Sequence, residues 1–134
     1  MKTLFVCQAN VARSQAAMEL FRQMGHEADS AGTKVDAPGK TLAERPSAKN
    51  VVQVMREEYG VDMINNVRTQ ITKELAQRYD QIVVMAEHET VPGWLLEDSR
   101  ALFWKIDDPK GQDIAFVRRV VGEVREHVDS LIND

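Results

Sequence analysis

The 134-residue chain contains a single cysteine, and this scarcity excludes two structural devices. A lone thiol cannot close an internal disulfide, and it does not suffice for a structural zinc site built from several cysteines. Prolines (4) and glycines (7) are also few, and no linker-like stretch divides the chain. We therefore expect one domain, residues 1–134, without a structural metal.

Long apolar runs and clustered positive charge are absent as well. No run approaches the ~20 apolar residues of a membrane span, and the apolar segment at residues 3–7 is too short for a secretory signal. The formal net charge is −4, and the basic residues are dispersed among acids. Nucleic acids and acidic membranes bind clustered Lys and Arg, so we expect a cytoplasmic protein that binds neither.

The sequence does contain an alternation of β-prone runs and amphipathic stretches. Short apolar and β-branched runs predict four strands, at residues 3–6, 28–31, 81–85 and 102–106. Apolar spacing and capping residues predict four helices, at residues 17–24, 46–59, 73–78 and 114–131. Strands separated mostly by helices predict an α/β fold with a four-stranded parallel sheet, order 2-1-3-4, flanked by helices on both faces and flavodoxin-like. Ligands of such sheets bind beyond the carboxyl ends of the strands, here beside the first strand.

The loop after the first strand has the composition of an anion site. A cradle of backbone N–H groups at a helix N-terminus binds a tetrahedral anion without any side chain. An arginine fork at the end of the loop holds two further oxygens. This oxyanion loop directly follows Cys7 and consists of Gln8, Ala9, Asn10, Val11, Ala12, Arg13 and Ser14.

The same positive environment favours the thiolate of Cys7, which we interpret as a nucleophile with Arg13 as its anion clamp. Ser14 is placed to donate its hydroxyl to the sulfur. Asn10 lies in mid-loop, where a left-handed backbone conformation is required and asparagine tolerates it better than most residues.

A proton donor is expected at the end of the fourth predicted strand. Asp108 lies there, at the same sheet edge as Cys7, and a carboxylic acid can protonate a leaving oxygen and then deprotonate the attacking water. Asp107 is the competing candidate, and we prefer Asp108 because Pro109 fixes the residue that it follows. Glu87 and Glu89, after the third strand, are placed where they could shape substrate choice, but we interpret them as solvated loop acids, the commoner role.

The segments around Cys7, Arg13 and Asp108 resemble those of the low-molecular-weight protein tyrosine phosphatases and the related thiol-dependent arsenate reductases. The similarity covers nearly the whole chain, including residues 4–14, 29–33, 66–72, 80–85 and 108–109. It implies a phosphocysteine intermediate, no metal and no other cofactor. It also implies that Ser30 hydrogen-bonds Asn10 and, with Ser14, supports the shape of the loop.

Two departures from the family bear on the substrate. Residues 34–37 and 110–111 contain no aromatic side chain where the phosphatases carry the walls of a phenyl slot, so the stacking that favours a phenyl ester is lost. Residues 85–100 contain neither of the two further cysteines that many related arsenate reductases use.

We expect a monomeric phosphate-monoester hydrolase of this type, acting on a phosphorylated protein or a small phosphate ester. Its catalytic residues would be Cys7, Arg13 and Asp108. The first alternative is an arsenate reductase in which an external thiol or a redoxin resolves the Cys7 adduct. The second alternative is an inactive domain that only binds an oxyanion.

Overall fold

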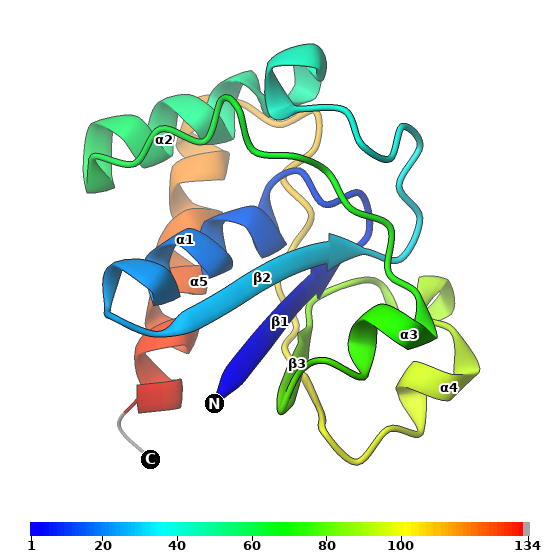
Figure 1. The fold of residues 1–134 in the computed structure, drawn as a ribbon. Coiled ribbons are helices and arrows are strands. Elements are labelled where there is room, and N and C mark those ends of the chain that lie inside the picture. Colours follow the sequence, from blue (N-terminus) through cyan, green and yellow to red (C-terminus); the bar gives the residue numbers. More distant parts are fainter. Residues whose placement is uncertain (133–134) are drawn as a thin grey trace.

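The computed structural model describes residues 1–132, and its centre is a four-stranded parallel sheet (Figure 1). The strands are β1 (Lys2–Cys7), β2 (Glu27–Gly32), β3 (Gln81–Val84) and β4 (Ala101–Phe103). Their order is β2-β1-β3-β4, and each neighbouring pair is parallel. The predicted fold class is confirmed, while residues 133–134 of the predicted domain lie outside the described residues.

Helices cover both faces of the sheet (Figure 1). One face packs on α1 (Arg13–Gln23), α2 (Lys49–Tyr59) and α5 (Ile114–Ile132). The other face packs on two single-turn helices, α3 (Lys73–Ala76) and α4 (Gly93–Leu96). Residues 1–132 also contain three short 3₁₀ turns, at Leu42–Glu44, Pro46–Ala48 and His88–Thr90. None of the helices in residues 1–132 is long and apolar enough to cross a membrane.

The side-chain alternation of β1 divides the core into two layers. Phe5 and Cys7 point toward α1, α2 and α5, whereas Leu4 and Val6 point toward α3 and α4. Phe5 packs edge to face against Phe21 of α1, with ring centroids 5.6 Å apart. Both faces of the strand are buried, as the continuous apolar run predicted.

The valines of α5 form the stripe that the sequence predicted for the last helix. They belong to the larger core cluster and are at most 3% exposed, at positions Val117, Val120, Val121, Val124 and Val128. An apolar stripe of this width is buried only where it packs against other elements of the fold. The helix therefore closes the larger core cluster together with α1 and α2.

The fourth strand differs from the prediction, which placed it at residues 102–106. β4 ends at Phe103, and the N–H of Trp104 makes one further bond to the carbonyl oxygen of Val84, at 2.9 Å. Beyond that point the Arg13 guanidinium donates to the carbonyl oxygens of Met85 and Ile106, at 2.7 and 2.9 Å. A side chain thus takes the place where the backbone ladder would have continued.

The sequence also predicted no helix between the third and fourth strands, which is wrong. Two neighbouring parallel strands need a crossover connection, and α4 lies on the crossover between β3 and β4. Pro92 is the N-cap residue of this turn, where its missing N–H costs no intrahelical hydrogen bond. The single turn of Gly93–Leu96 was too short to show a helical period.

We expect Leu20→Ala to lower the free energy of unfolding by about 2–5 kcal/mol, the range for a fully buried leucine whose cavity does not collapse. Leu20 lies in α1 and is 0% exposed, whereas Leu102 on the edge strand is 40% exposed. Leu102→Ala is the matched control and should cost about 1 kcal/mol or less. Urea denaturation followed by circular dichroism measures both, and equal losses would contradict this description of the core.

Candidate active site

The oxyanion loop begins where β1 leaves the sheet, and its first carbonyl groups are tied to the chain that follows β2. The carbonyl oxygen of Cys7 accepts a hydrogen bond from the N–H of Thr33, and that of Gln8 accepts one from Lys34, both at 2.9 Å. Parallel pairing is thus extended past the end of both strands. It orients the first peptide groups of the loop with their oxygens toward β2.

Two buried side chains hold the next carbonyl groups. Arg68, 1% exposed, donates two hydrogen bonds to the carbonyl oxygen of Ala9, from Nη2 at 2.9 Å and from Nε at 3.2 Å. Gln15, 0% exposed, donates from Nε2 to the carbonyl oxygen of Asn10 at 3.3 Å. The four consecutive carbonyl groups of residues 7–10 therefore have partners outside the pocket.

The backbone N–H groups of the same loop, unlike its carbonyl groups, have no partners in the described part of the chain. Within residues 1–132, no N–H of residues 8–12 donates to an acceptor of the protein. Buried peptide N–H groups are almost always paired, and a row of free ones is the device that binds anions. The loop offers five such donors between Cys7 and Arg13, at the N-terminus of α1.

Asn10 fixes the turn at the middle of the loop. Its φ of 56° is the only positive value of a non-glycine residue within residues 1–132. The side-chain Nδ2 of Asn10 donates to the hydroxyl oxygens of Ser14 and Ser30, at 2.8 and 3.0 Å. The side-chain Oδ1 of Asn10 accepts from the backbone N–H of Thr69 at 2.8 Å. The left-handed conformation is thus stabilised by three hydrogen bonds to separate segments.

Gly32 allows the end of β2 to approach the loop closely. A Cβ atom at this position would lie 2.5 Å from the carbonyl oxygen of Gln8 and 2.9 Å from the backbone nitrogen of Asn10. Both of these atoms belong to backbone that cannot move without reshaping the oxyanion loop. Glycine is therefore required here by contact rather than by its own backbone angles.

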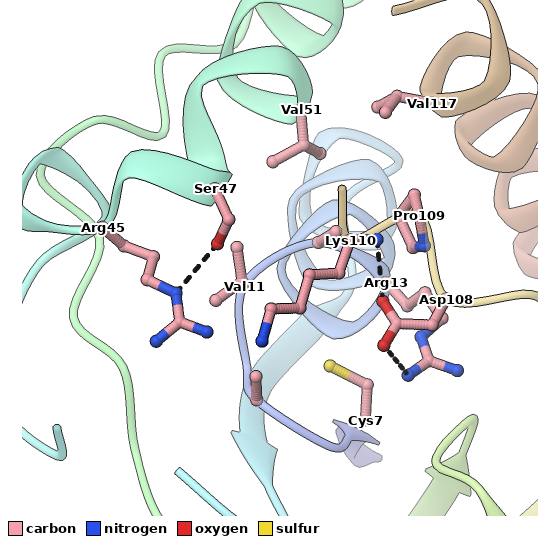
Figure 2. A pocket seen from close by; sticks show the side chains of 12 residues that line it. Cys7, Val11, Arg13, Arg45, Ser47, Val51, Asp108, Pro109, Lys110 and Val117 are labelled. Carbon is pink, nitrogen blue, oxygen red and sulfur yellow. Dashed lines mark hydrogen bonds and ion pairs between the residues drawn. The ribbon is translucent and has the colours of Figure 1, made fainter. Parts of the chain in front are cut away.

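The structure brings the three predicted catalytic side chains to one pocket (Figure 2). Cys7 is 3% exposed at its floor, with Sγ 3.0 Å from the hydroxyl oxygen of Ser14. Arg13 and Asp108 line the same pocket, and Asp108 Oδ2 lies 3.8 Å from Arg13 Nη2. Asp107, the competing candidate, is not among the lining residues.

Arg13 is 2% exposed and bridges several elements. Besides the carbonyl oxygens of Met85 and Ile106, its guanidinium reaches the carboxylate of Glu87, with Nη1 at 3.2 Å and Nη2 at 2.9 Å. Glu87 thus pairs with the two terminal nitrogens, Nη1 and Nη2, whereas Nε has no acceptor among residues 1–132. The edge formed by Nε and the second hydrogen of Nη2 remains available for two oxygens of an anion.

The interaction with Glu87 also changes the proton affinity of both groups. Burial alone would lower the pKa of Arg13, but the hydrogen bond to Glu87 and the nearby charges of Cys7, Glu87 and Asp108 raise it above its ordinary value. Burial alone would raise the pKa of Glu87, and the hydrogen bond and charge of Arg13 lower it below its ordinary value. Glu87, whose side chain is 38% exposed, is therefore an ion-pair partner of Arg13 and not only a solvated loop acid.

Small and charged residues form the walls of the pocket, with no aromatic ring among them (Figure 2). The apolar walls are Ala9, Val11, Ala12, Val51, Pro109 and Val117, and the polar residues are Arg45, Ser47 and Lys110. Pro109 and Lys110 directly follow Asp108, while Arg45 and Ser47 come from the segment before α2. The absence of aromatic walls noted in the sequence thus holds for the assembled pocket.

The sequence did not predict Gln15, Gly32, Arg68 and Glu87 as parts of the site, nor the pocket residues Arg45, Ser47 and Lys110. Arg68 lies 59 residues from the carbonyl group that it holds. No local spacing signals a contact of that kind. Gly32 carried the clearest signal, since a glycine that ends a strand often marks a close backbone approach.

The fold and the loop define a class of α/β protein in which a cysteine lies at the floor of a backbone anion cradle. A model of the low molecular weight phosphotyrosine protein phosphatases matches residues 2–134, and the chain belongs to this family. A glutaredoxin arsenate reductase of Synechocystis sp. is 30% identical over 135 residues, covering 98% of this chain and 95% of that protein.

Two further relatives represent the phosphatase branch. A probable low molecular weight protein-tyrosine-phosphatase, EpsP of Ralstonia solanacearum, is 27% identical over 140 residues, covering 96% of this chain and 92% of that protein. The crystal structure of a low molecular weight protein tyrosine phosphatase from T. tengcongensis superimposes with a TM-score of 0.82, at 23% identity, covering 99% of this chain and 98% of that one.

We expect Gly32→Ala to weaken the binding of phosphate at least tenfold, because its Cβ would displace the backbone of the oxyanion loop. Gly122→Ala, at a helix position with no atom within 4 Å of the added carbon, is the control. It should leave phosphate binding unchanged and stabilise α5 by about 0.5–1 kcal/mol. Isothermal titration with inorganic phosphate measures both, and unimpaired binding by Gly32→Ala would refute the required close approach.

Glu87→Gln should lower the free energy of unfolding at pH 7 by about 1 kcal/mol, at the upper end for a partly exposed ion pair. The folded-state pKa of Glu87 is depressed, so its contribution is present above the unfolded-state pKa of about 4.3 and is lost as the pH falls through the lower folded-state value. The difference in free energy of unfolding between wild type and Glu87→Gln, measured by denaturation, should therefore be smaller at pH 3 than at pH 7. Glu89→Gln, two residues away, should change stability by less than about 0.5 kcal/mol at either pH.

Proposed function

We propose that the chain is a phosphate-monoester hydrolase that acts through a phosphocysteine intermediate at Cys7. The observation that carries this proposal is the row of free N–H groups of residues 8–12, which lies between a cysteine at the pocket floor and a buried arginine. Such donors stabilise the charge that develops on the equatorial oxygens during phosphoryl transfer. Membership of the phosphatase family supports the same reaction class.

In the first step the Cys7 sulfur attacks phosphorus, so a sulfur–phosphorus bond forms while the bond from phosphorus to the leaving oxygen breaks. Asp108, at the mouth of the pocket, gives its proton to that oxygen, which leaves as an alcohol. The free edge of Arg13 and the loop N–H groups hold the three remaining oxygens. The Ser14 hydroxyl, 3.0 Å from the sulfur, donates to the thiolate before attack and steadies it again as leaving group.

In the second step water attacks phosphorus and the sulfur–phosphorus bond breaks. Asp108, now ionised, accepts the proton of the attacking water, and inorganic phosphate is released. One carboxyl group thus serves as acid and then as base, which requires access to solvent between the steps. Its side chain is 41% exposed, which meets this requirement.

Arsenate reduction is the second candidate, and the curated relative of 30% identity favours it. The Cys7 sulfur would displace an oxygen of arsenate as water. An external thiol would then attack the Cys7 sulfur, forming a mixed disulfide while the arsenic takes up two electrons and leaves as arsenite. With a single cysteine in the chain, a second thiol or a redoxin must reduce this disulfide.

We expect Cys7→Ser to abolish hydrolysis of an aryl phosphate and Asp108→Asn to lower kcat by about a hundredfold or more, the scale for losing a positioned acid. Asp107→Asn is the matched control and should retain kcat within about fivefold, because Asp107 does not line the pocket. Steady-state assays with 4-nitrophenyl phosphate measure all three. A large loss in Asp107→Asn with none in Asp108→Asn would reassign the proton donor.

A side-by-side assay distinguishes the two candidate reactions. Aryl phosphate hydrolysis should proceed without added thiol, and arsenate should act as a competitive inhibitor with little thiol consumption. Arsenate-dependent oxidation of glutathione, with or without a glutaredoxin, at rates far above the phosphatase rate would instead make the chain a reductase. Phosphate binding with neither activity would leave only the oxyanion-binding domain.

A further inference from the structure

We infer that Arg45 and Lys110 form a second anion subsite at the mouth of the pocket, which takes a carboxylate carried by the leaving group of the phosphate ester. The inference rests on the proposed phosphatase reaction and extends it to a substrate class. Its basis is the position, fixation and charge of two cations that the phosphate site itself does not use.

Arg45 is held in place but keeps hydrogen-bonding capacity. Its side chain is 16% exposed; Nε donates to the hydroxyl of Ser47 at 2.8 Å, and Nη1 donates to the carboxylate of Asp36. No acceptor among residues 1–132 pairs with Nη2. A long side chain that is already fixed loses little further entropy when it binds an anion, which favours recognition over a mobile surface cation.

The charge of Arg45 is not cancelled by its partner. Asp36 also accepts a hydrogen bond of 2.5 Å from Arg68, so one carboxylate is shared by two guanidinium groups. The hydrogen bonds from Arg68 and from Arg45 lower the pKa of Asp36 to about 2, and this carboxylate therefore stays ionised. The group of three residues keeps one net positive charge beside the pocket.

Lys110 supplies the second cation. Its side chain extends into the pocket (Figure 2), and its ammonium group takes part in no ion pair inside the described part of the chain. The backbone N–H of Lys110 donates to the carboxylate of Asp108 at 3.0 Å, so the start of this side chain is fixed relative to the proton donor. A group bonded to the leaving oxygen, which Asp108 must reach, therefore lies close to Lys110.

The carboxylates in the inner part of the pocket do not balance the charges of Arg45 and Lys110. Around Arg13 the protein already places the carboxylates of Glu87 and Asp108, so that cation is balanced by the protein itself. At the mouth, no carboxylate other than Asp108 lines the pocket opposite Arg45 and Lys110. The walls also lack the aromatic rings that would select an uncharged phenyl group, so charge is the remaining means of selection.

Two non-hydrolysable phosphonates test the subsite by binding alone. 4-Carboxybenzylphosphonate should bind the wild type about tenfold more tightly than benzylphosphonate, the scale of one charge-assisted interaction. Arg45→Met and Lys110→Met should each reduce this ratio to about threefold or less, while the affinity for benzylphosphonate falls less than twofold. Lys2→Met removes the same charge at the opposite end of β1 and should retain the full ratio.

The outcomes separate the inference from the proposed function. Equal affinity for both phosphonates, or an equal loss of both in Arg45→Met, would overturn the subsite and leave the phosphatase proposal intact. Failure of both phosphonates to bind would contradict the phosphate site itself. If Arg45→Met fails to fold, Lys110→Met still tests the subsite, because this substitution disrupts no ion pair.

Rates then identify the source of the carboxylate. kcat/KM is compared for phenyl and 4-carboxyphenyl phosphate, and for phosphotyrosine peptides that carry Glu or Gln next to the phosphorylated residue. A preference of about tenfold for the carboxylate in either pair, lost in both variants, supports the subsite and names small esters or acidic peptides as its ligands. No preference in either pair would contradict it. Raising the salt concentration should reduce a true preference.

Discussion

A backbone loop can offer free N–H groups to an anion only if its carbonyl groups are satisfied elsewhere, and this requirement organises the whole site. The carbonyl groups of residues 7 and 8 are taken by the chain after β2, and those of residues 9 and 10 by Arg68 and Gln15. Gly32 is the place where the two backbones come close enough for the first of these bonds. The fold thus determines the direction of the loop's peptide groups before any ligand arrives.

Arg13 connects this cradle to the rest of the sheet. Its guanidinium binds the carbonyl groups that follow β3 and β4 and is held at one end by Glu87, so the helix that begins with Arg13 cannot shift relative to these strands. The same contacts end the β-ladder early and turn the chain toward Asp108. These contacts of one buried side chain therefore position both Arg13, the proposed anion clamp, and the segment that carries Asp108, the proposed proton donor.

The sequence predicted those parts of the molecule that depend on local pattern. The strand and helix periods gave the sheet order and both layers, the spacing of Cys7 and Arg13 identified the loop, and Thr72 capped the helix that follows it. It did not predict contacts between distant segments, such as that of Arg68 with Ala9. The end of β4 was misplaced for the same reason, since it depends on a side chain that begins 90 residues earlier in the chain.

The division between inner and outer parts of the pocket explains why family membership leaves the substrate open. In the proposed site, neutral N–H groups and one arginine edge would recognise the geometry of a tetrahedral oxyanion, and phosphate and arsenate share this geometry. Discrimination must then arise from what the oxyanion carries, and only the walls contact that part. In this chain the walls offer short apolar side chains and two cations. We therefore expect a bare oxyanion to make no use of Arg45 and Lys110, and an ester with an acidic leaving group to pair with both.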